Sequence, residues 1–256
     1  MRKRWARAWR RASHPAQLLV VFCLLAVLAL AVNWIYQVAR KPTELFFPVS
    51  GTLYKTPAET WRSYGSAFRA HSTPIMTPPF LAALAQVEGS GNPLVRTYWR
   101  WSWRAAPLEL YRPASSAVGM YQITDGTFAE ARRFCIHDHA VAADGPWNDW
   151  DSCWFNALYF RVIPSHAIEL TSAYLDRAVS ATLARHHLGA ADLRRRQQLA
   201  AYIHLCGAGA GDAFAQRGLK FLPGERCGDH EARAYVGRVE AMRSVFAKLS
   251  EDVDAR

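Results

Sequence analysis

Residues 1–40 contain no aspartate or glutamate, although they contain seven arginines and lysines. This local absence of acidic side chains accounts for most of the formal net charge of +10. Residues 41–256 carry 24 of the 31 basic side chains and all 21 acidic ones, a near balance that gives no reason to expect a nucleic-acid-binding surface. Zinc-finger, helix-turn-helix and RNA-recognition patterns are also lacking, so no nucleic acid is expected among the partners.

Charged side chains are also absent between His14 and Arg40. This apolar run can cross a hydrocarbon core, which requires about 20 residues. We therefore expect a basic cytoplasmic segment at 1–15 and a transmembrane anchor at 16–38, with the rest of the chain exported. A cleaved signal peptide ending at Ala31 is the alternative. The length of the run favours the anchor.

The chain lacks a CxxC motif, so neither a metal site nor a cofactor is expected. Cys23 lies inside the apolar run as a small apolar side chain. The four remaining cysteines lie in the exported part, where an even number predicts two disulfides in one of three connectivities. Proximity in sequence favours Cys135–Cys153 and Cys206–Cys227.

Proline, glycine and serine are frequent in residues 39–73, which predicts a linker with a short helix around residues 58–70. Helical periodicity then recurs over much of residues 74–250, and a polar tail follows at 251–256. The sequence contains no internal repeat. A mainly α fold with one large core is expected.

The stretch TPPFLAALAQVEG predicts a helix that begins after Thr77 and ends at an acid, Glu88, followed by Gly89. Glu88 then lies at the carbonyl end of the helix dipole and beside an apolar face. Both effects disfavour the carboxylate, and a protonated glutamic acid can act as a general acid. An ordinary solvated glutamate in a last helical turn is the alternative interpretation.

Two sequence blocks, VEGSGNP and GMYQITDGT, resemble the soluble lytic transglycosylase (SLT) family of the lysozyme superfamily. Glu88, Asn92 and Pro93 match the first block, and Gly119, Gln122, Ile123 and Thr127 match the second. Ala201 and Tyr202 approximate a third block, Ala-Tyr-Asn-Ala-Gly. The resemblance implies a lysozyme-like α+β domain at 74–250 with a small β-element and Glu88 as the catalytic acid. It also implies substrate contacts from Gln122, Tyr202, Met120, Tyr121 and Ser116.

Three positions depart from the family pattern. Gly89 stands where the family usually has serine, Gly91 where an aromatic residue is frequent, and Ile203 where an asparagine follows the tyrosine. His204 has no family counterpart and is a weaker candidate. These departures leave the acid intact and indicate a divergent member.

Aromatic residues alternate at Trp99, Trp101 and Trp103, which predicts an extended strand with one aromatic face. Lysozyme-like domains often have a β-element here that forms one wall of the cleft. Exposed rings would stack on sugar faces. The equally weighted alternative is that these rings fill the core.

The chemistry implied by the resemblance is cleavage of peptidoglycan between N-acetylmuramic acid and N-acetylglucosamine. No second carboxylate lies in a matching motif, so Glu88 would serve first as acid and then as base, closing a 1,6-anhydro ring on the muramic acid. One alternative is a hydrolytic muramidase in which Asp125 or Asp149 activates water. The other is an inactive wall-binding or assembly protein.

The expected partners are peptidoglycan glycan strands and the membrane. The expected location is the bacterial inner membrane, with one pass, a cytoplasmic N-terminus and a periplasmic catalytic domain. Specialised transglycosylases often serve an envelope-spanning secretion or conjugation apparatus. General wall turnover fits the sequence equally well.

Overall fold

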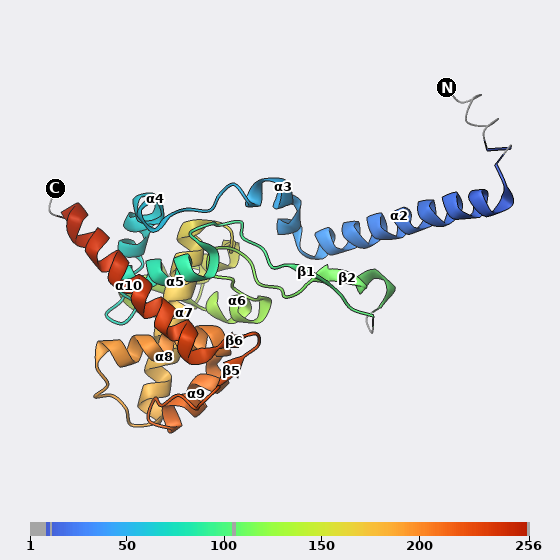
Figure 1. Cartoon of the computed structure of the whole chain (residues 1–256). Coiled ribbons are helices and arrows are strands. Elements are labelled where there is room, and N and C mark those ends of the chain that lie inside the picture. The colour runs from blue at the N-terminus through green and yellow to red at the C-terminus, as the bar shows by residue number, and fades with distance from the viewer. Residues whose placement is uncertain (1–8, 11, 104–105, 255–256) are drawn as a thin grey trace. The chain divides into compact units, whose positions relative to one another are not determined.

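The structure, a computed structural model, describes residues 9–10, 12–103 and 106–254. These residues are mainly helical, with three two-stranded antiparallel sheets (Figure 1). Two compact units are present. Unit 1 joins Met1–Leu45 to Thr97–Ser115, and unit 2 joins Phe46–Arg96 to Ser116–Arg256. Most of the expected basic segment and the end of the polar tail lie outside the described residues.

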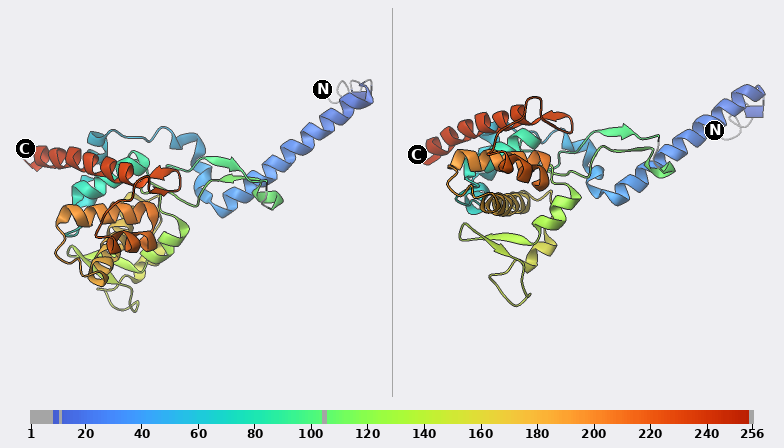
Figure 2. Two further views of the ribbon diagram at one scale, coloured as in Figure 1. Left: turned by 60° about the horizontal axis from the view of Figure 1, so that its bottom comes forward. Right: turned by 90° about the horizontal axis from the view of Figure 1, so that it is seen from below.

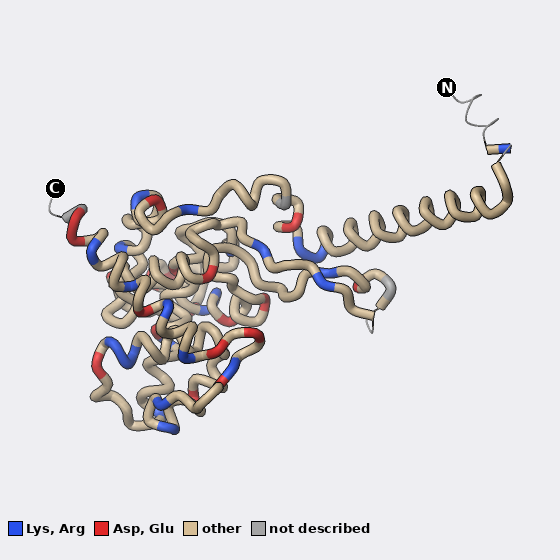
Figure 3. Tube along the Cα trace, in the orientation of Figure 1, with Lys and Arg blue, Asp and Glu red and all other residues tan. Residues whose placement is uncertain are grey.

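Unit 1 is built on helix α2, His14–Arg40. This helix extends the predicted 16–38 span by two residues at each end, and Figure 3 shows no charged residue along it before its last turn. Among the described helices, α2 alone is long and apolar enough to cross a membrane. Its other described elements are the strands β1 (Trp99–Trp101) and β2 (Tyr111–Pro113), the 3₁₀ segment Pro107–Glu109, and the 3₁₀ segment Pro42–Phe46, whose last residue begins unit 2.

Unit 2 carries the other helices and two hairpins. The helices are α3 (Phe47–Ser50), α4 (Pro57–Ala70), α5 (Pro78–Gly89), α6 (Asp125–Ala131), α7 (Pro164–Arg185), α8 (Leu193–Cys206), α9 (Ala208–Gln216) and α10 (Ala232–Asp254). The hairpins are β3–β4 (Phe134–His137 and Ala140–Ala143) and β5–β6 (Arg226–Cys227 and His230–Glu231), and a 3₁₀ turn spans Trp154–Leu158.

Helix α4 confirms the short helix predicted around residues 58–70. It begins at a capping box, in which the Thr56 hydroxyl accepts from the Glu59 N–H and the Glu59 carboxylate accepts from the Thr56 N–H. Two otherwise unpaired donors are satisfied in this way, which fixes the start of the helix.

Helix α5 is the central helix of unit 2. Its residues 80–85 are at most 2% exposed, so the helix is apolar on every side, as expected for a helix inside a core. Helix α10 packs along α5 and also contacts α4 and α8. Figure 2 shows α10 running along one side of this unit from the β5–β6 hairpin. Each large apolar side chain buried here contributes about 1.5–3 kcal/mol to folding.

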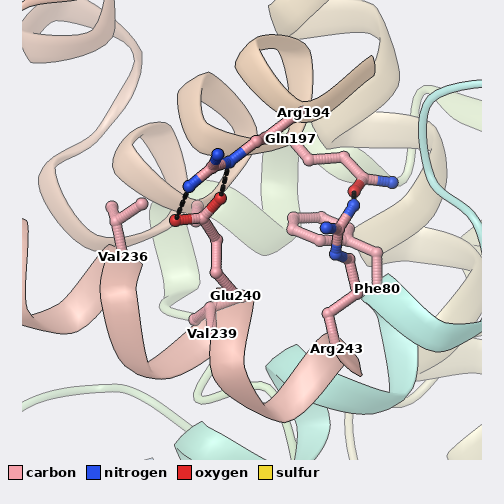
Figure 4. A pocket seen from close by; sticks show the side chains of 8 residues that line it. Phe80, Arg194, Gln197, Val236, Val239, Glu240 and Arg243 are labelled. Atoms are coloured by element: carbon pink, nitrogen blue, oxygen red, sulfur yellow. Dashed lines mark hydrogen bonds and ion pairs between the residues drawn. The ribbon is translucent and has the colours of Figure 1, made fainter. Parts of the chain in front are cut away.

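A polar contact joins α8 to both α5 and α10. Gln197, 3% exposed, donates to the Ile75 carbonyl (2.9 Å) and to the Thr77 hydroxyl (3.0 Å), and its own carbonyl accepts from Arg243 (2.8 Å). Figure 4 shows the bond between Gln197 and Arg243 beside the ion pair of Arg194 with Glu240 (2.6 Å). Thr77 therefore precedes α5 as predicted, but its hydroxyl binds Gln197 and makes no cap hydrogen bond.

Both predicted disulfides are confirmed. Cys135 is bonded to Cys153 and Cys206 to Cys227, across sequence separations of 18 and 21 residues. Loops of this size stabilise a fold by about 3 kcal/mol in the chain-entropy model. Cys23 is free and exposed on α2.

Candidate active site

Glu88 lies in the last turn of α5, as the sequence predicts. The helix ends one residue later than expected, because Gly89 is still helical and Ser90 takes the left-handed conformation (φ 49°) that closes it. The Glu88 side chain is 16% exposed. Its carboxylate is therefore largely shielded from water and lies at the carbonyl end of an apolar helix.

Two side chains from other helices meet this carboxylate at a single oxygen. The Tyr235 hydroxyl, on α10, donates a hydrogen bond to Glu88 Oε1. The His204 Nε2 atom, on α8, lies 3.7 Å from the same oxygen. Among the described residues no hydrogen bond or ion pair reaches Oε2. One oxygen is thus held by the protein, and no described residue forms a hydrogen bond or ion pair with the other.

The Tyr235 side chain is enclosed by the core and is 2% exposed. Burial, together with the nearby Glu88 carboxylate, raises the pKa of Tyr235 well above its usual value of 10.0. The phenol therefore keeps its proton at every physiological pH and acts only as a donor toward Glu88. Such a donor holds the carboxylate in one orientation.

Gly89 brings the first two sequence blocks into contact. A Cβ atom at this position would lie 2.9 Å from the Cα and carbonyl oxygen atoms of Met120. These are backbone atoms, which cannot rotate away. The glycine that departs from the family pattern is therefore what allows the end of α5 to pack directly against the Gly119–Met120 backbone.

Gly91 and Ile203, the other two departures, also have packing reasons. Gly91 has φ +64°, and its Cβ would lie 2.2 Å from the Thr60 hydroxyl oxygen. Ile203 is 1% exposed, and its Cγ1 would lie 2.3 Å from a Cβ on Gly211. Each unusual residue is thus matched by a complementary residue elsewhere in this chain.

The second block forms a tight loop before α6. Gly119 has φ +78°, and a Cβ there would lie 2.3 Å from the Arg161 carbonyl oxygen, so only glycine fits. The Arg161 guanidinium donates to the carbonyls of Ser116 (3.0 Å) and Ile123 (2.7 Å), which close the loop at its two ends. Arg161 also pairs with Asp125 (2.7 Å).

Gln122 belongs to this loop and adopts φ 48°, in the left-handed region. Its side-chain amide donates to the carbonyls of Val95 (3.2 Å) and Gly119 (2.9 Å). These bonds connect the loop to the segment that follows α5. The amide nitrogen of Gln122 is therefore occupied by the protein, and a substrate contact from this side chain stays a prediction that rests on its carbonyl oxygen.

Met120 and Tyr121 have side chains that are fully buried. The Tyr121 hydroxyl donates to the Leu81 carbonyl (3.0 Å) and so ties the loop to the middle of α5. The Ser116 hydroxyl accepts from the Asp125 N–H (3.1 Å) at the start of α6. All three side chains hold the loop in place, so substrate contacts expected at Met120 and Tyr121 would have to come from their main-chain atoms.

Tyr202, for which the third block predicts a substrate contact, has its side chain engaged by other residues of the protein. Its hydroxyl donates to Glu225 (2.8 Å), and its ring stacks on Phe214 with centroids 4.3 Å apart. Glu225 is also paired with Arg217 (2.6 Å). The tyrosine that reaches Glu88 is Tyr235 from α10, for which the sequence carries no family signal.

The Cys206–Cys227 disulfide connects the two elements that supply His204 and Tyr235. Cys206 ends α8, two residues after His204. Cys227 pairs with His230 across the β5–β6 hairpin, and this hairpin leads directly into α10 and Tyr235. The disulfide therefore links the two segments of chain that carry the Glu88 partners.

Neither aspartate considered as a water-activating base is recorded as a partner of Glu88. Asp125 is paired with Arg161, and the exposed Asp149 accepts from the Asp151 N–H (3.0 Å). Within the described ranges, Cys135, His137 and Cys153 could also place ligand atoms close together, but the two sulfurs are joined in a disulfide. The arrangement at Glu88 is therefore one carboxylate with a phenol and an imidazole.

Comparison with known proteins adds no family assignment: no protein-family model matches the chain, and the search of curated proteins finds no significant match.

Proposed function

We propose that this chain is a membrane-tethered lytic transglycosylase of peptidoglycan, with a lysozyme-like catalytic domain and Glu88 as its only catalytic carboxylate. The observation that carries the proposal is the asymmetric environment of that carboxylate. Tyr235 and His204 engage Oε1, while no described residue engages Oε2. A group that gives a proton and then takes one back must have an oxygen that can come within hydrogen-bond reach of the substrate.

The first step is donation of a proton from Glu88 Oε2 to the glycosidic oxygen between N-acetylmuramic acid and N-acetylglucosamine. The C1–O bond of the muramic acid breaks, and the N-acetylglucosamine side departs as an alcohol. The substrate's own acetamido oxygen stabilises the positive charge that develops at C1. Tyr235 holds the carboxyl group in position during this step and keeps its own proton.

In the second step the Glu88 carboxylate removes the proton from the C6 hydroxyl of the same muramic acid. The C6 oxygen then bonds to C1, which closes a 1,6-anhydro ring and restores the acid. Because the attacking hydroxyl is part of the substrate, effective molarities of about 10⁵ M or more reduce what the protein must supply to positioning. A second protein carboxylate is not needed.

The packing around the departures from the family pattern supports an enzyme over an inactive wall-binding protein. Gly89 and Gly91 are accommodated by Met120 and Thr60, and Ile203 by Gly211. The two short blocks of the resemblance lie in contact at Gly89 and Met120, which is the arrangement that a shared site requires.

The tether is helix α2, with the basic residues before it on the cytoplasmic side and both disulfides on the exported side. An oxidising compartment favours the persistence of Cys135–Cys153 and Cys206–Cys227. A secretion or conjugation apparatus would use such an enzyme to open the wall locally, and general wall turnover would use the same chemistry.

The test is digestion of purified peptidoglycan by the full chain in detergent, with muropeptides identified by mass spectrometry. The wild-type protein should release 1,6-anhydro products, and Glu88→Gln should release none. Glu130→Gln, an exposed position on α6, is the matched control and should retain activity. Full activity of Glu88→Gln would show that another group is the acid, and no release by the wild-type protein would leave only a binding role. Products with free reducing ends would indicate a hydrolytic muramidase.

A further inference from the structure

Unit 1 contains an aromatic hairpin, which we define as residues 97–115. In β1 and β2, Trp101 lies opposite Tyr111 and Arg100 lies opposite Arg112. Side chains alternate along a strand, so the rings and the arginines lie on opposite faces. Trp101 also stacks on Trp103, with ring centroids 5.4 Å apart and planes inclined by 9°. The hairpin is thus amphipathic, with an aromatic face and a cationic face.

Helix α2 holds the hairpin through polar side chains in its last two turns. Asn33 Nδ2 donates to the Tyr111 carbonyl (2.6 Å), and Gln37 Nε2 donates to the Leu108 carbonyl (2.8 Å). Asn33 and Gln37 are the only buried residues of this helix, most of which is exposed. Arg40, one turn further, is paired with Glu109. These contacts fix the hairpin at one height along α2.

The position of the hairpin along α2 can be compared with the thickness of a bilayer. Helix α2 has 27 residues and is therefore about 40 Å long at 1.5 Å per residue. A hydrocarbon core of about 30 Å takes up about 20 of them. Counted from Ala16, these end near Ile35, between Asn33 and Gln37. The hairpin is therefore attached where the helix leaves the hydrocarbon and enters the headgroup region.

The exposed side chains at this level have the chemistry of a membrane interface. Trp103 is 80% exposed, Tyr98 65% and Trp101 52%, and Trp34 and Ile35 on α2 are also exposed. Tryptophan and tyrosine are enriched at the boundary between headgroups and acyl chains, where an amphipathic ring is favoured. Large exposed apolar patches on proteins generally mark sites of interaction with a membrane, a ligand or another protein.

The cationic face fits lipid phosphates. Arg100 is exposed and has no ion pair within the described part of the chain, whereas Arg112, which lies opposite it, is paired with Glu109 (3.0 Å). Guanidinium groups bind phosphate oxygens through paired hydrogen bonds. A hairpin lying in the interface would direct its rings toward the acyl chains and leave Arg100 among the headgroups.

We propose that the aromatic hairpin is a second membrane contact, seated in the lipid interface of the leaflet from which α2 emerges. This inference rests on the proposed role of α2 as a membrane anchor. The chain passes between the two units three times, after Leu45, Arg96 and Ser115. A hairpin held at the membrane would therefore tether unit 2 through three segments of chain, where a simple anchor provides one.

The experiment places the full chain in vesicles of phosphatidylcholine and phosphatidylglycerol and measures the depth of a fluorescent probe. Native Cys23 is the one free cysteine of the described chain and lies in the middle of α2, so a probe there reports the bilayer centre. In a Cys23→Ala background, Trp103→Cys and Tyr98→Cys carry the probe on the hairpin. Quenchers are iodide in water and spin labels placed near the headgroup or near the acyl-chain end of the lipid.

The proposal expects the hairpin probes to lose more fluorescence with the shallow spin label than with the deep one, and to be protected from iodide. The Cys23 probe should show the opposite depth preference. Hairpin probes quenched by iodide and unaffected by lipid labels, with Cys23 still deep, would overturn the hairpin contact alone. A Cys23 probe exposed to iodide would overturn the anchor as well.

A sugar-binding role for the same rings gives a separate result. Soluble glycan chains added to vesicles would shield the hairpin probes from iodide without any quenching by spin-labelled lipid, and this outcome contradicts the proposal. Asn33→Leu combined with Gln37→Leu removes the two hydrogen bonds to the hairpin and keeps α2 apolar. In this variant the hairpin probes should lose their protection from iodide while the Cys23 probe stays deep.

Discussion

The Tyr235 hydroxyl donates to Glu88 Oε1 across 147 residues of sequence, and this bond joins the last helix of the fold to the end of its central helix. Tyr235 is 2% exposed and keeps its proton at physiological pH. The bond therefore orients the carboxyl group without competing for the proton that the proposed reaction moves.

Tyr235→Phe should lower the rate of peptidoglycan cleavage by about 10- to 100-fold, because a hydrogen bond to a charged group contributes about 1.5–3 kcal/mol. Tyr202→Phe is the matched control. It removes the hydroxyl of a tyrosine whose residue exposure is the same, and this hydroxyl also donates to a carboxylate, that of Glu225. Both variants should lose similar thermal stability. If both variants lost the same amount of cleavage rate, Tyr235 would have no specific role in orienting the Glu88 carboxyl group.

Loss of the Cys206–Cys227 disulfide should reduce activity more than loss of Cys135–Cys153. Each double serine variant should lose about 3 kcal/mol of stability in the chain-entropy model, because the loops are of similar size. Only Cys206–Cys227 connects the elements that carry His204 and Tyr235. The measurement compares turnover of the two variants at a temperature where circular dichroism shows both folded. Equal turnover would contradict the positioning role.

Gly89→Ala should destabilise the fold by about 1–3 kcal/mol, since the added Cβ meets the Met120 backbone and the site is fully packed. Gly126→Ala, on α6, is the control, for which we expect a gain in stability and not a loss. Nothing lies within 4 Å of a Cβ there, so alanine should stabilise the helix by about 0.5–1 kcal/mol. Urea denaturation of the two variants gives both values. If Gly89→Ala left the free energy of unfolding unchanged, the contact between the two sequence blocks would be loose.

The arrangement of Glu88 shows how far the sequence predicts the site. Helix α5 and its terminal acid follow from local signals, the prolines after Thr77 and the run of apolar residues before Glu88. The disulfide pairing follows from proximity in the chain. Tyr235 does not follow, because α10 reaches Glu88 only through the packing of α10 on α5, which no short motif encodes.

His204 and Tyr202 illustrate the same limit on one helix. The family block pointed to Tyr202, but its ring stacks on Phe214 and its hydroxyl binds Glu225. His204, two residues later, is the side chain of α8 that approaches Glu88. Residues two apart on a helix lie on different faces, so the rotation of α8 decides which one reaches the site. That rotation is set by tertiary contacts such as those of Gln197.

A buried polar network away from Glu88 predicts how stability depends on pH. Glu169, 4% exposed, accepts from the Tyr159 hydroxyl (2.6 Å) and the Ile136 N–H (3.0 Å), and His71 Nδ1 lies 3.5 Å from it. Burial lowers the pKa of His71 below its usual value of 6.5, although Glu169 acts in the opposite direction. Burial lowers the pKa of His166 in the same way.

Stability should therefore fall as the pH drops below 6.5, because the unfolded chain then binds protons at these histidines that the folded chain does not. The contribution is complete above that value and is lost as pH falls through the lowered pKa of the folded state. His71→Gln should flatten this part of the profile, measured as the free energy of unfolding against pH. An unchanged slope would show that His71 is not the group responsible.

The most direct test of the single-carboxylate mechanism is the origin of the oxygen at the cleaved sugar. Full-length protein is incubated with peptidoglycan in water enriched in heavy oxygen, and the muramic acid ends are analysed by mass spectrometry. The account predicts 1,6-anhydro ends that contain no oxygen from solvent, and no products at all from Glu88→Gln. Reducing ends that carry the heavy oxygen would contradict it, because water would then be the acceptor.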